Sequence, residues 1–186
     1  GDLPAAVAAF ERSFALNHPD QIDPPPCFNT WAFAARGYMA ALVDLDRAEE
    51  ARRFGLRAYE CCRVQETTWI DVVECELALA EASVGEVASA AARLEALIER
   101  NLDKAPARVS WLYEARARVA IRARDELAAV QYAELATRDG RGGSGHRVLP
   151  RHARMLEEAR RAGMDLELAQ RGFEDTVLGG SRSNER

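Results

Sequence analysis

The sequence predicts an all-α fold, a right-handed superhelical stack of antiparallel helix hairpins with about nine helices. Three observations support this prediction. Alanine, leucine, glutamate and arginine, which all favour helices, dominate the composition. Similar turn sequences recur along the chain at a nearly constant spacing. Between these turns, apolar residues recur every three or four positions, as they do on one face of a helix.

The recurring turns set the period of the predicted array. They begin at residues 1, 46, 85, 124 and 163, so the first interval is 45 residues and the next three are 39. The longer interval contains residues 18–29, HPDQIDPPPCFN, whose prolines cannot lie inside a helix. Six additional residues in that segment account for the difference. The first four turns are each followed, five residues on, by an alanine: Ala6, Ala51, Ala90 and Ala129.

Each period is predicted to hold two helices, a shorter one directly after the turn and a longer one after a connector. Each pair carries more apolar surface than an isolated hairpin can bury, so neighbouring hairpins are expected to stack. The shorter helix after the turn at residue 85 is expected at residues 88–100. The longer helices are expected at residues 30–43, 68–84, 107–123 and 149–162.

The first helix, expected at residues 2–16 with Asp2 as its N-cap, has no predicted partner helix before it. We therefore expect the chain to be a piece of a longer array, in which Val7, Phe10 and Phe14 lack a neighbour. An uncovered apolar face of this kind favours self-association through the N-terminal helix. Residues 1–178 are predicted to form one repeat domain, and residues 179–186 a flexible tail.

The opening residues also follow the spacing of a known repeat. Gly1-Asp2, Ala6, Phe10 and Ser13, with Pro19 one place late, resemble the second helix of a tetratricopeptide repeat (TPR). The period of 39 residues is longer than the 34 residues of a TPR. We assign the extra residues to the first helix of each hairpin. Long repeats of this kind resemble those of ATP-dependent bacterial transcription activators and of kinase- or cyclase-linked signalling proteins. The resemblance implies a fold more than a function.

The residue types that carry chemistry form no recognisable catalytic or metal site in the sequence. Cys61 and Cys62 are adjacent and far from any histidine, so with Cys75 they are expected to be buried thiols, not zinc ligands. The glycine-rich segment 139–145 lacks the lysine of a phosphate-binding loop and is expected to be a flexible connection. His146 and His152 are expected on the surface. The sequence therefore predicts no enzyme, no metal and no cofactor.

Three tryptophans lie near the starts of the longer helices. A strict period of 39 would place the equivalents of Trp31 at residues 70 and 109, but the tryptophans are Trp69 and Trp111. This mismatch favours packing in the core over a shared aromatic cage for a ligand.

The two halves of the chain differ in charge, since residues 1–100 carry −8 and residues 101–186 carry +3. The arginines of the third and fourth longer helices are candidates for binding an acidic partner, and a solvated helix face is the competing interpretation. Arg118 and Arg122 share one side of their helix, and they are expected to align with Arg147 and Arg151. Nucleic acid is not favoured as the partner, because the chain as a whole is acidic and no aromatic residues are interspersed among these arginines. The predicted partner-binding residues are Arg118, Arg122, Arg151 and Arg154.

Two function classes fit these observations. The first is a non-catalytic module that binds a protein or peptide within a larger bacterial signalling or regulatory protein. The second is a sensor that binds a small ligand or peptide and controls an attached ATPase, kinase or DNA-binding domain. No apolar run reaches the ~18–20 residues of a membrane span, and the start does not resemble a signal peptide, so we expect a cytoplasmic protein.

Overall fold

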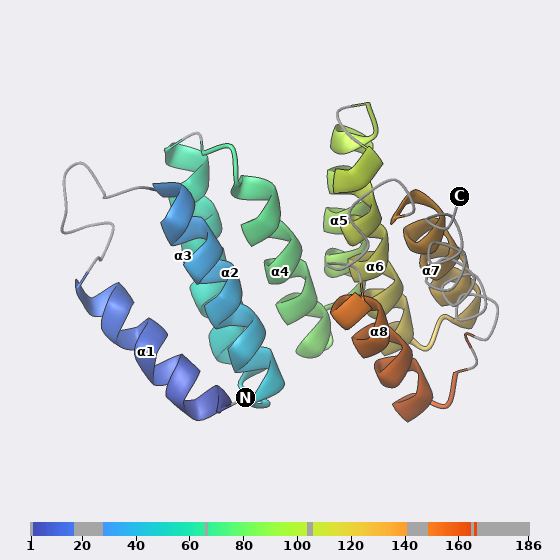
Figure 1. Ribbon diagram of the computed structural model, residues 1–186, viewed down its shortest axis with the longest axis horizontal. Helices are drawn as coiled ribbons and strands as arrows, with labels where there is room; N and C mark the ends of the chain where they lie inside the picture. Colours follow the sequence, from blue (N-terminus) through green and yellow to red (C-terminus); the bar gives the residue numbers. More distant parts are fainter. Residues whose placement is uncertain are drawn as a thin grey trace, which may run out of the picture. The chain divides into compact units, whose positions relative to one another are not determined.

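The computed structural model describes residues 2–16, 28–65, 67–103, 106–140, 149–164 and 166, and all the regular structure in them is α-helical (Figure 1). The all-α prediction is confirmed. The chain divides into two compact units, Gly1–Ala90 (unit 1) and Ala91–Arg186 (unit 2). No helix in the described ranges is both long and apolar enough to cross a membrane.

Unit 1 is a stack of helices in which one helix contacts all the others. This central helix, α2, packs against α1, α3 and α4, and α3 also packs against α4 (Figure 1). The side chain of Asp2 caps α1, because its Oδ1 accepts a hydrogen bond of 3.0 Å from the backbone N–H of Ala5. The helices are α1 (Leu3–Leu16), α2 (Phe28–Asp44), α3 (Ala48–Val64) and α4 (Ile70–Ser83).

Unit 2 repeats this arrangement around α6. α6 packs against α7, its antiparallel neighbour along the chain, and against α8. Asp125 caps α7 as Asp2 caps α1, with an Oδ1 that accepts a hydrogen bond of 3.1 Å from the N–H of Ala128. The helices are α5 (Val87–Asn101), which begins in unit 1, α6 (Pro106–Ala123), α7 (Glu126–Gly140) and α8 (Leu149–Arg161).

The predicted helix positions agree with the structure, and the predicted difference in length holds in part of the chain, where α5 has 15 residues and the following α6 has 18. α3 has 17 residues and the following α4 has 14, so the helix directly after the turn is the longer one here. α4 begins after Trp69 because the backbone N–H of Trp69 donates to Oγ1 of Thr67 at 3.4 Å, in a turn that precedes the helix. The described residues hold eight helices, and the ninth, expected after Gly163, lies outside them, as does the tail at 179–186.

The 39-residue period is a property of the backbone as well as of the sequence. Within the described ranges, left-handed backbone occurs at four residues spaced by 39: Asp46 (φ 61°), Gly85 (91°), Arg124 (61°) and Gly163 (72°). Each ends a helix in a Schellman motif, in which the next backbone N–H returns to the carbonyl of the residue five places earlier. These bonds join Arg47 to Leu42, Glu86 to Glu81, Asp125 to Ala120 and Met164 to Ala159, at 2.9, 2.9, 3.0 and 2.9 Å.

The N-terminal helix is covered by its own unit, contrary to the sequence-based expectation. Val7 and Phe14 are buried, and Phe10 is half-buried. The chain approaches closely at Gly37 of α2, where an added Cβ would lie 3.0 Å from Cζ of Phe10. The expectation that these three side chains lack a neighbour is wrong, because α2 and the ring of Phe54 on α3 pack against this face of α1.

Candidate functional site

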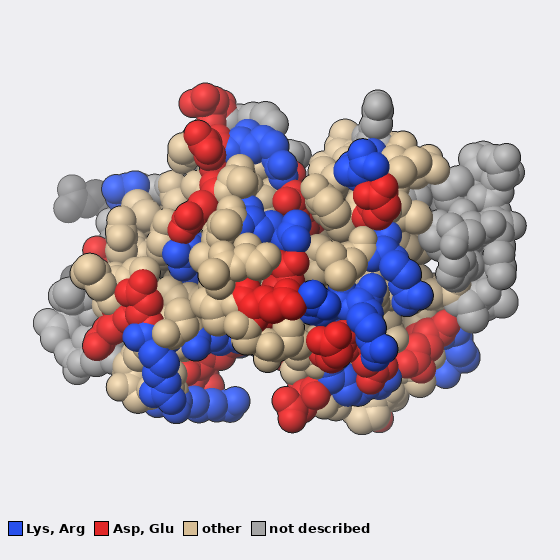
Figure 2. Space-filling model, turned by 180° about the vertical axis from the view of Figure 1, so that it is seen from behind, with Lys and Arg blue, Asp and Glu red and all other residues tan. Residues whose placement is uncertain are grey.

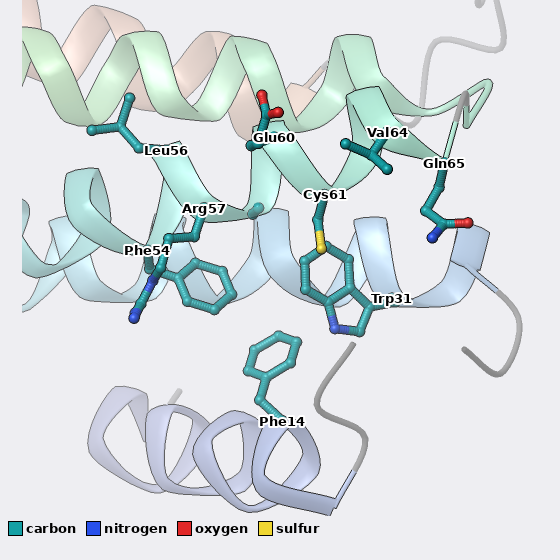
Figure 3. A pocket seen from close by; sticks show the side chains of 10 residues that line it. Phe14, Trp31, Phe54, Leu56, Arg57, Glu60, Cys61, Val64 and Gln65 are labelled. Atoms are coloured by element: carbon teal, nitrogen blue, oxygen red, sulfur yellow. The ribbon is translucent and has the colours of Figure 1, made fainter. Parts of the chain in front are cut away.

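An apolar groove lies between α1 and α3 in unit 1, with α2 behind it (Figure 3). Its larger hollow has a volume of about 610 Å³. Most of its wall comes from α3, whose side chains at helical spacing follow the groove, while α1 supplies Phe14 and the start of α2 supplies Trp31. A volume of this size is within the range of ligand-binding clefts, ~300–1,000 Å³.

Three aromatic rings from three different helices form the inner wall of the groove. The ring centroids of Phe14 and Phe54 are 5.1 Å apart, those of Phe14 and Trp31 5.9 Å, and those of Trp31 and Phe54 6.4 Å. All three pairs are tilted or edge-on, the geometries that aromatic rings prefer. The rings therefore join the helices and also leave an apolar wall facing the hollow (Figure 3).

The groove continues along α3 into a second hollow of about 500 Å³. The two hollows share Phe54, Leu56 and Arg57, so they meet at the middle of α3. Leu56 and Val64 are 41% and 63% exposed, which leaves apolar surface in contact with solvent at both the centre and one end.

The charged side chains of the groove differ in whether they are already paired. Glu50 accepts two hydrogen bonds from Arg47, at 2.8 and 2.9 Å, and this contact holds the pKa of Glu50 below its usual value. Glu60 is bound in the same way by Arg63, at 2.8 and 2.6 Å, which lowers its pKa. Neither Arg53 nor Arg57, which also line the groove, makes a hydrogen bond or ion pair with a described residue.

The thiols separate into one at the groove and two in the core. Cys61 is half-exposed and lines the groove, whereas Cys62 and Cys75 are buried. Burial, together with the neighbouring Cys61, raises the pKa of Cys62 to about 12. The prediction that the thiols are buried is confirmed for Cys62 and Cys75 and is wrong for Cys61. Cys61 and Cys62 differ in burial because consecutive residues of a helix point ~100° apart. Cys27 lies outside the described residues.

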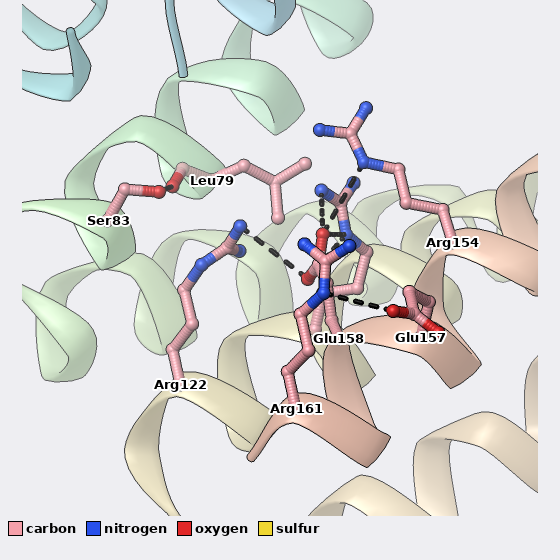
Figure 4. A network of polar contacts seen from close by, with 8 residues as sticks. Leu79, Ser83, Arg122, Arg154, Glu157, Glu158 and Arg161 are labelled. Atoms are coloured by element: carbon pink, nitrogen blue, oxygen red, sulfur yellow. Dashed lines mark hydrogen bonds and ion pairs between the residues drawn. The ribbon is translucent and has the colours of Figure 1, made fainter. Parts of the chain in front are cut away.

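Three of the four predicted arginines of unit 2, Arg118, Arg122 and Arg154, gather around a carboxylate of their own chain (Figure 4). Arg118 of α6 is buried and donates to both carboxylate oxygens of Glu158, at 2.7 and 3.1 Å. Arg122 and Arg154 each approach Glu158 to 3.5 Å. Burial opposes ionisation of Glu158, but the Arg118 hydrogen bonds and the two other guanidinium charges outweigh it and lower the pKa.

Three of the arginines predicted to bind an acidic partner already contact an acidic residue of the same chain, Glu158. The expectation that Arg118 and Arg122 lie together is met, and Arg154 of α8 joins them, but Arg118 contacts Glu158 instead of solvent. The surface in Figure 2 likewise shows acidic and basic side chains beside one another. The side chains of Arg108 and Arg151, and all of Arg147, lie outside what the structure describes.

The other sequence candidates fall in several places. His152 is buried in α8 with 1% of its surface exposed, so its expected surface position is wrong. Its position corresponds, at the 39-residue period, to buried Ala35 and Tyr113, which explains its burial. His146 and residues 141–145 lie outside the described residues. In the described part of the chain, no group of three or more histidine, cysteine or acidic side chains could hold a metal ion.

The tryptophans are half-buried at all three positions. Trp31 packs in the aromatic wall of the groove, while Trp69 packs against Phe33 in a tilted arrangement with ring centroids 4.6 Å apart. Phe54, Leu56 and Arg57 of α3 were not among the site residues predicted from the sequence. Their signal in the sequence was the spacing of apolar side chains along α3 with arginines between them, but it points to a groove only once α1 is known to lie opposite.

Comparison with known proteins adds no identification, because no family model, curated protein or solved structure matches this chain.

Proposed function

We propose that this chain is a non-catalytic protein-interaction module that binds a segment of a partner protein in the groove between α1 and α3. The observation that carries the proposal is the groove itself, an open apolar surface supported by rings from three helices. Stacked hairpins with a 39-residue backbone period present such a surface on a rigid scaffold. The TPR resemblance and a role within a larger bacterial signalling or regulatory protein are part of the same proposal.

A selection from a displayed library of random peptides tests this function. We expect the protein to enrich peptides whose binding is lost in a variant with Leu56→Gln and Val64→Gln, because both side chains expose apolar surface at the groove. The matched control carries Leu102→Gln and Leu127→Gln, which are 51% and 82% exposed and lie outside the groove. Enrichment of no peptide, or equal loss of binding in both variants, would contradict the proposal.

The size of the larger hollow favours one alternative, a sensor for a small ligand. A cleft of about 610 Å³ lined by three aromatic rings can hold a small apolar molecule, and it can equally hold several apolar side chains of a partner protein. Thermal unfolding in the presence of pooled metabolites distinguishes the two functions. A ligand that raises the melting temperature of the wild type and not of the Leu56→Gln, Val64→Gln variant would favour the sensor.

A further inference from the structure

The groove has the length of a short helix. Its two hollows together extend along α3 from Glu50 to Gln65, the residue that follows the last residue of the helix. Fifteen helical steps at 1.5 Å correspond to about 22 Å, the length of a partner helix of about four turns. Because Phe54, Leu56 and Arg57 belong to both hollows, an occupant of this length would contact one continuous surface.

The unbalanced charge of this surface is positive. Glu50 and Glu60 are each bound by an arginine outside the two hollows, Arg47 and Arg63. Arg53 and Arg57 are exposed and lie four residues apart, so they point to one side of α3. Neither is engaged by a described side chain through a hydrogen bond or ion pair, although the charge of Arg53 acts on Glu50.

We propose that the groove between α1 and α3 binds an amphipathic α-helix whose flank is acidic. This inference rests on the proposed function and names the partner for the same site. The apolar face of the partner helix contacts Phe54, Leu56 and Val64, and its carboxylates lie beside Arg53 and Arg57. A small ligand would fill one hollow, whereas a helix with anchors at positions i, i+3, i+4 and i+7 uses both.

The probe for this proposal is a labelled synthetic peptide of about 16 residues, long enough for the groove, with leucines at helical spacing and glutamates on the flanks. A second peptide carries lysine in place of every glutamate. Fluorescence anisotropy with the full chain measures both affinities. We expect the glutamate peptide to bind more tightly than the lysine peptide, and its affinity to fall as salt rises to about 0.5 M.

A charge reversal in the groove gives the sharper test. The variant with Arg53→Glu and Arg57→Glu should lose about tenfold in affinity for the glutamate peptide and gain affinity for the lysine peptide. Both arginines are exposed, so circular dichroism should show an unchanged fold. The matched control, Arg160→Glu with Arg161→Glu, makes the same change in net charge at side chains that are 61% and 75% exposed, and it should leave both affinities unchanged.

The outcomes separate this inference from the proposed function. Library selection could yield groove-binding peptides while the charge-reversal variant still prefers the glutamate peptide over the lysine peptide. In that case the acidic flank of the partner helix is wrong, and the proposed interaction module stands. If no peptide is selected at all, both fail. A more than tenfold rise in affinity on replacing Asp20 and Asp23 by asparagine would assign the groove to the chain's own segment 17–27 and overturn a partner helix as the occupant.

Discussion

Units 1 and 2 build the same hairpin repeat from side chains of different size. Tyr38 and Phe54 of unit 1 form an edge-on ring pair with centroids 4.9 Å apart. The residues two periods later are Arg116 and Tyr132, and there the guanidinium lies over the ring at 4.8 Å. The same pair of repeat positions thus holds a contact between two aromatic rings in unit 1 and a cation–π contact in unit 2.

The contacts around these pairs follow the same plan. Glu11 of α1 accepts a hydrogen bond from the Tyr38 hydroxyl at 3.4 Å, and Glu95 of α5 accepts one from Arg116 at 2.8 Å. Each glutamate lies on the helix that precedes its partner's helix in the chain. The comparison teaches that the period fixes which positions meet, while the residue types decide whether the contact is apolar or charged.

The cores differ in the same direction. In unit 2, the cluster of buried side chains shared by α6, α7 and α8 consists mainly of alanines with Met155, and Leu94, Leu97 and Leu112 are buried elsewhere in the unit. The cluster of unit 1 contains aromatic rings and Leu42. Large rings hold α1 and α3 apart and leave an apolar groove between them, while the arginines of α6 and α8 in unit 2 converge on Glu158. Our proposal therefore assigns partner binding to the groove of unit 1, and we interpret the arginine network of unit 2 as support for its fold.

The largest expected effect comes from exchanging one core position between the units. Leu42 is fully buried, and its equivalents two and three periods later are Ala120 and Ala159. Leu42→Ala should lower the free energy of unfolding by ~2–5 kcal/mol, because it leaves a cavity among large neighbours. The reverse change, Ala159→Leu, should cost ~1–3 kcal/mol by overpacking. Urea unfolding measures both, and a negligible cost for Leu42→Ala would contradict the difference between the cores.

A smaller effect is expected from the arginine network. Arg118→Gln should lower the free energy of unfolding by ~1.5–3 kcal/mol, since it removes charged hydrogen bonds at a side chain that is 8% exposed. Arg161→Gln is the control, because this arginine pairs with Glu157 at the surface, is 75% exposed and should cost only ~0–1 kcal/mol. Equal effects of the two substitutions would show that the network does not stabilise unit 2 beyond an ordinary surface pair.

The smallest effect is a pH dependence. The pKa of Glu158 is lowered in the folded protein, so its contribution is present at neutral pH and is lost as the pH falls through the ordinary glutamate value of ~4.3 toward the folded one. Glu158→Gln should therefore be less stable than the wild type at pH 7, and the difference should shrink in acid. Thermal melts across this range check the sign, and a difference that stays constant would exclude the ionised carboxylate as its source.

The fold could be predicted from the sequence because its determinants are local. The turns at Asp46, Gly85, Arg124 and Gly163 are formed by a few consecutive residues each, and the helices between them follow from apolar spacing. The groove could not be predicted, because it depends on how far α1 stands from α3, a distance set by rings that meet across three helices. The pairing of Arg118 with Glu158 could not be predicted for the same reason, because the two residues are 40 positions apart and lie on different helices.

Hydrogen–deuterium exchange of the full chain with and without the glutamate peptide tests the central claim most directly. Binding in the groove stabilises the helices that form it against local opening, so their backbone amides should exchange more slowly. We predict slower exchange in α1 and α3 with unchanged exchange in α6, α7 and α8. Slower exchange confined to α6 and α8, around the arginine network, would contradict the account and return the binding site to unit 2.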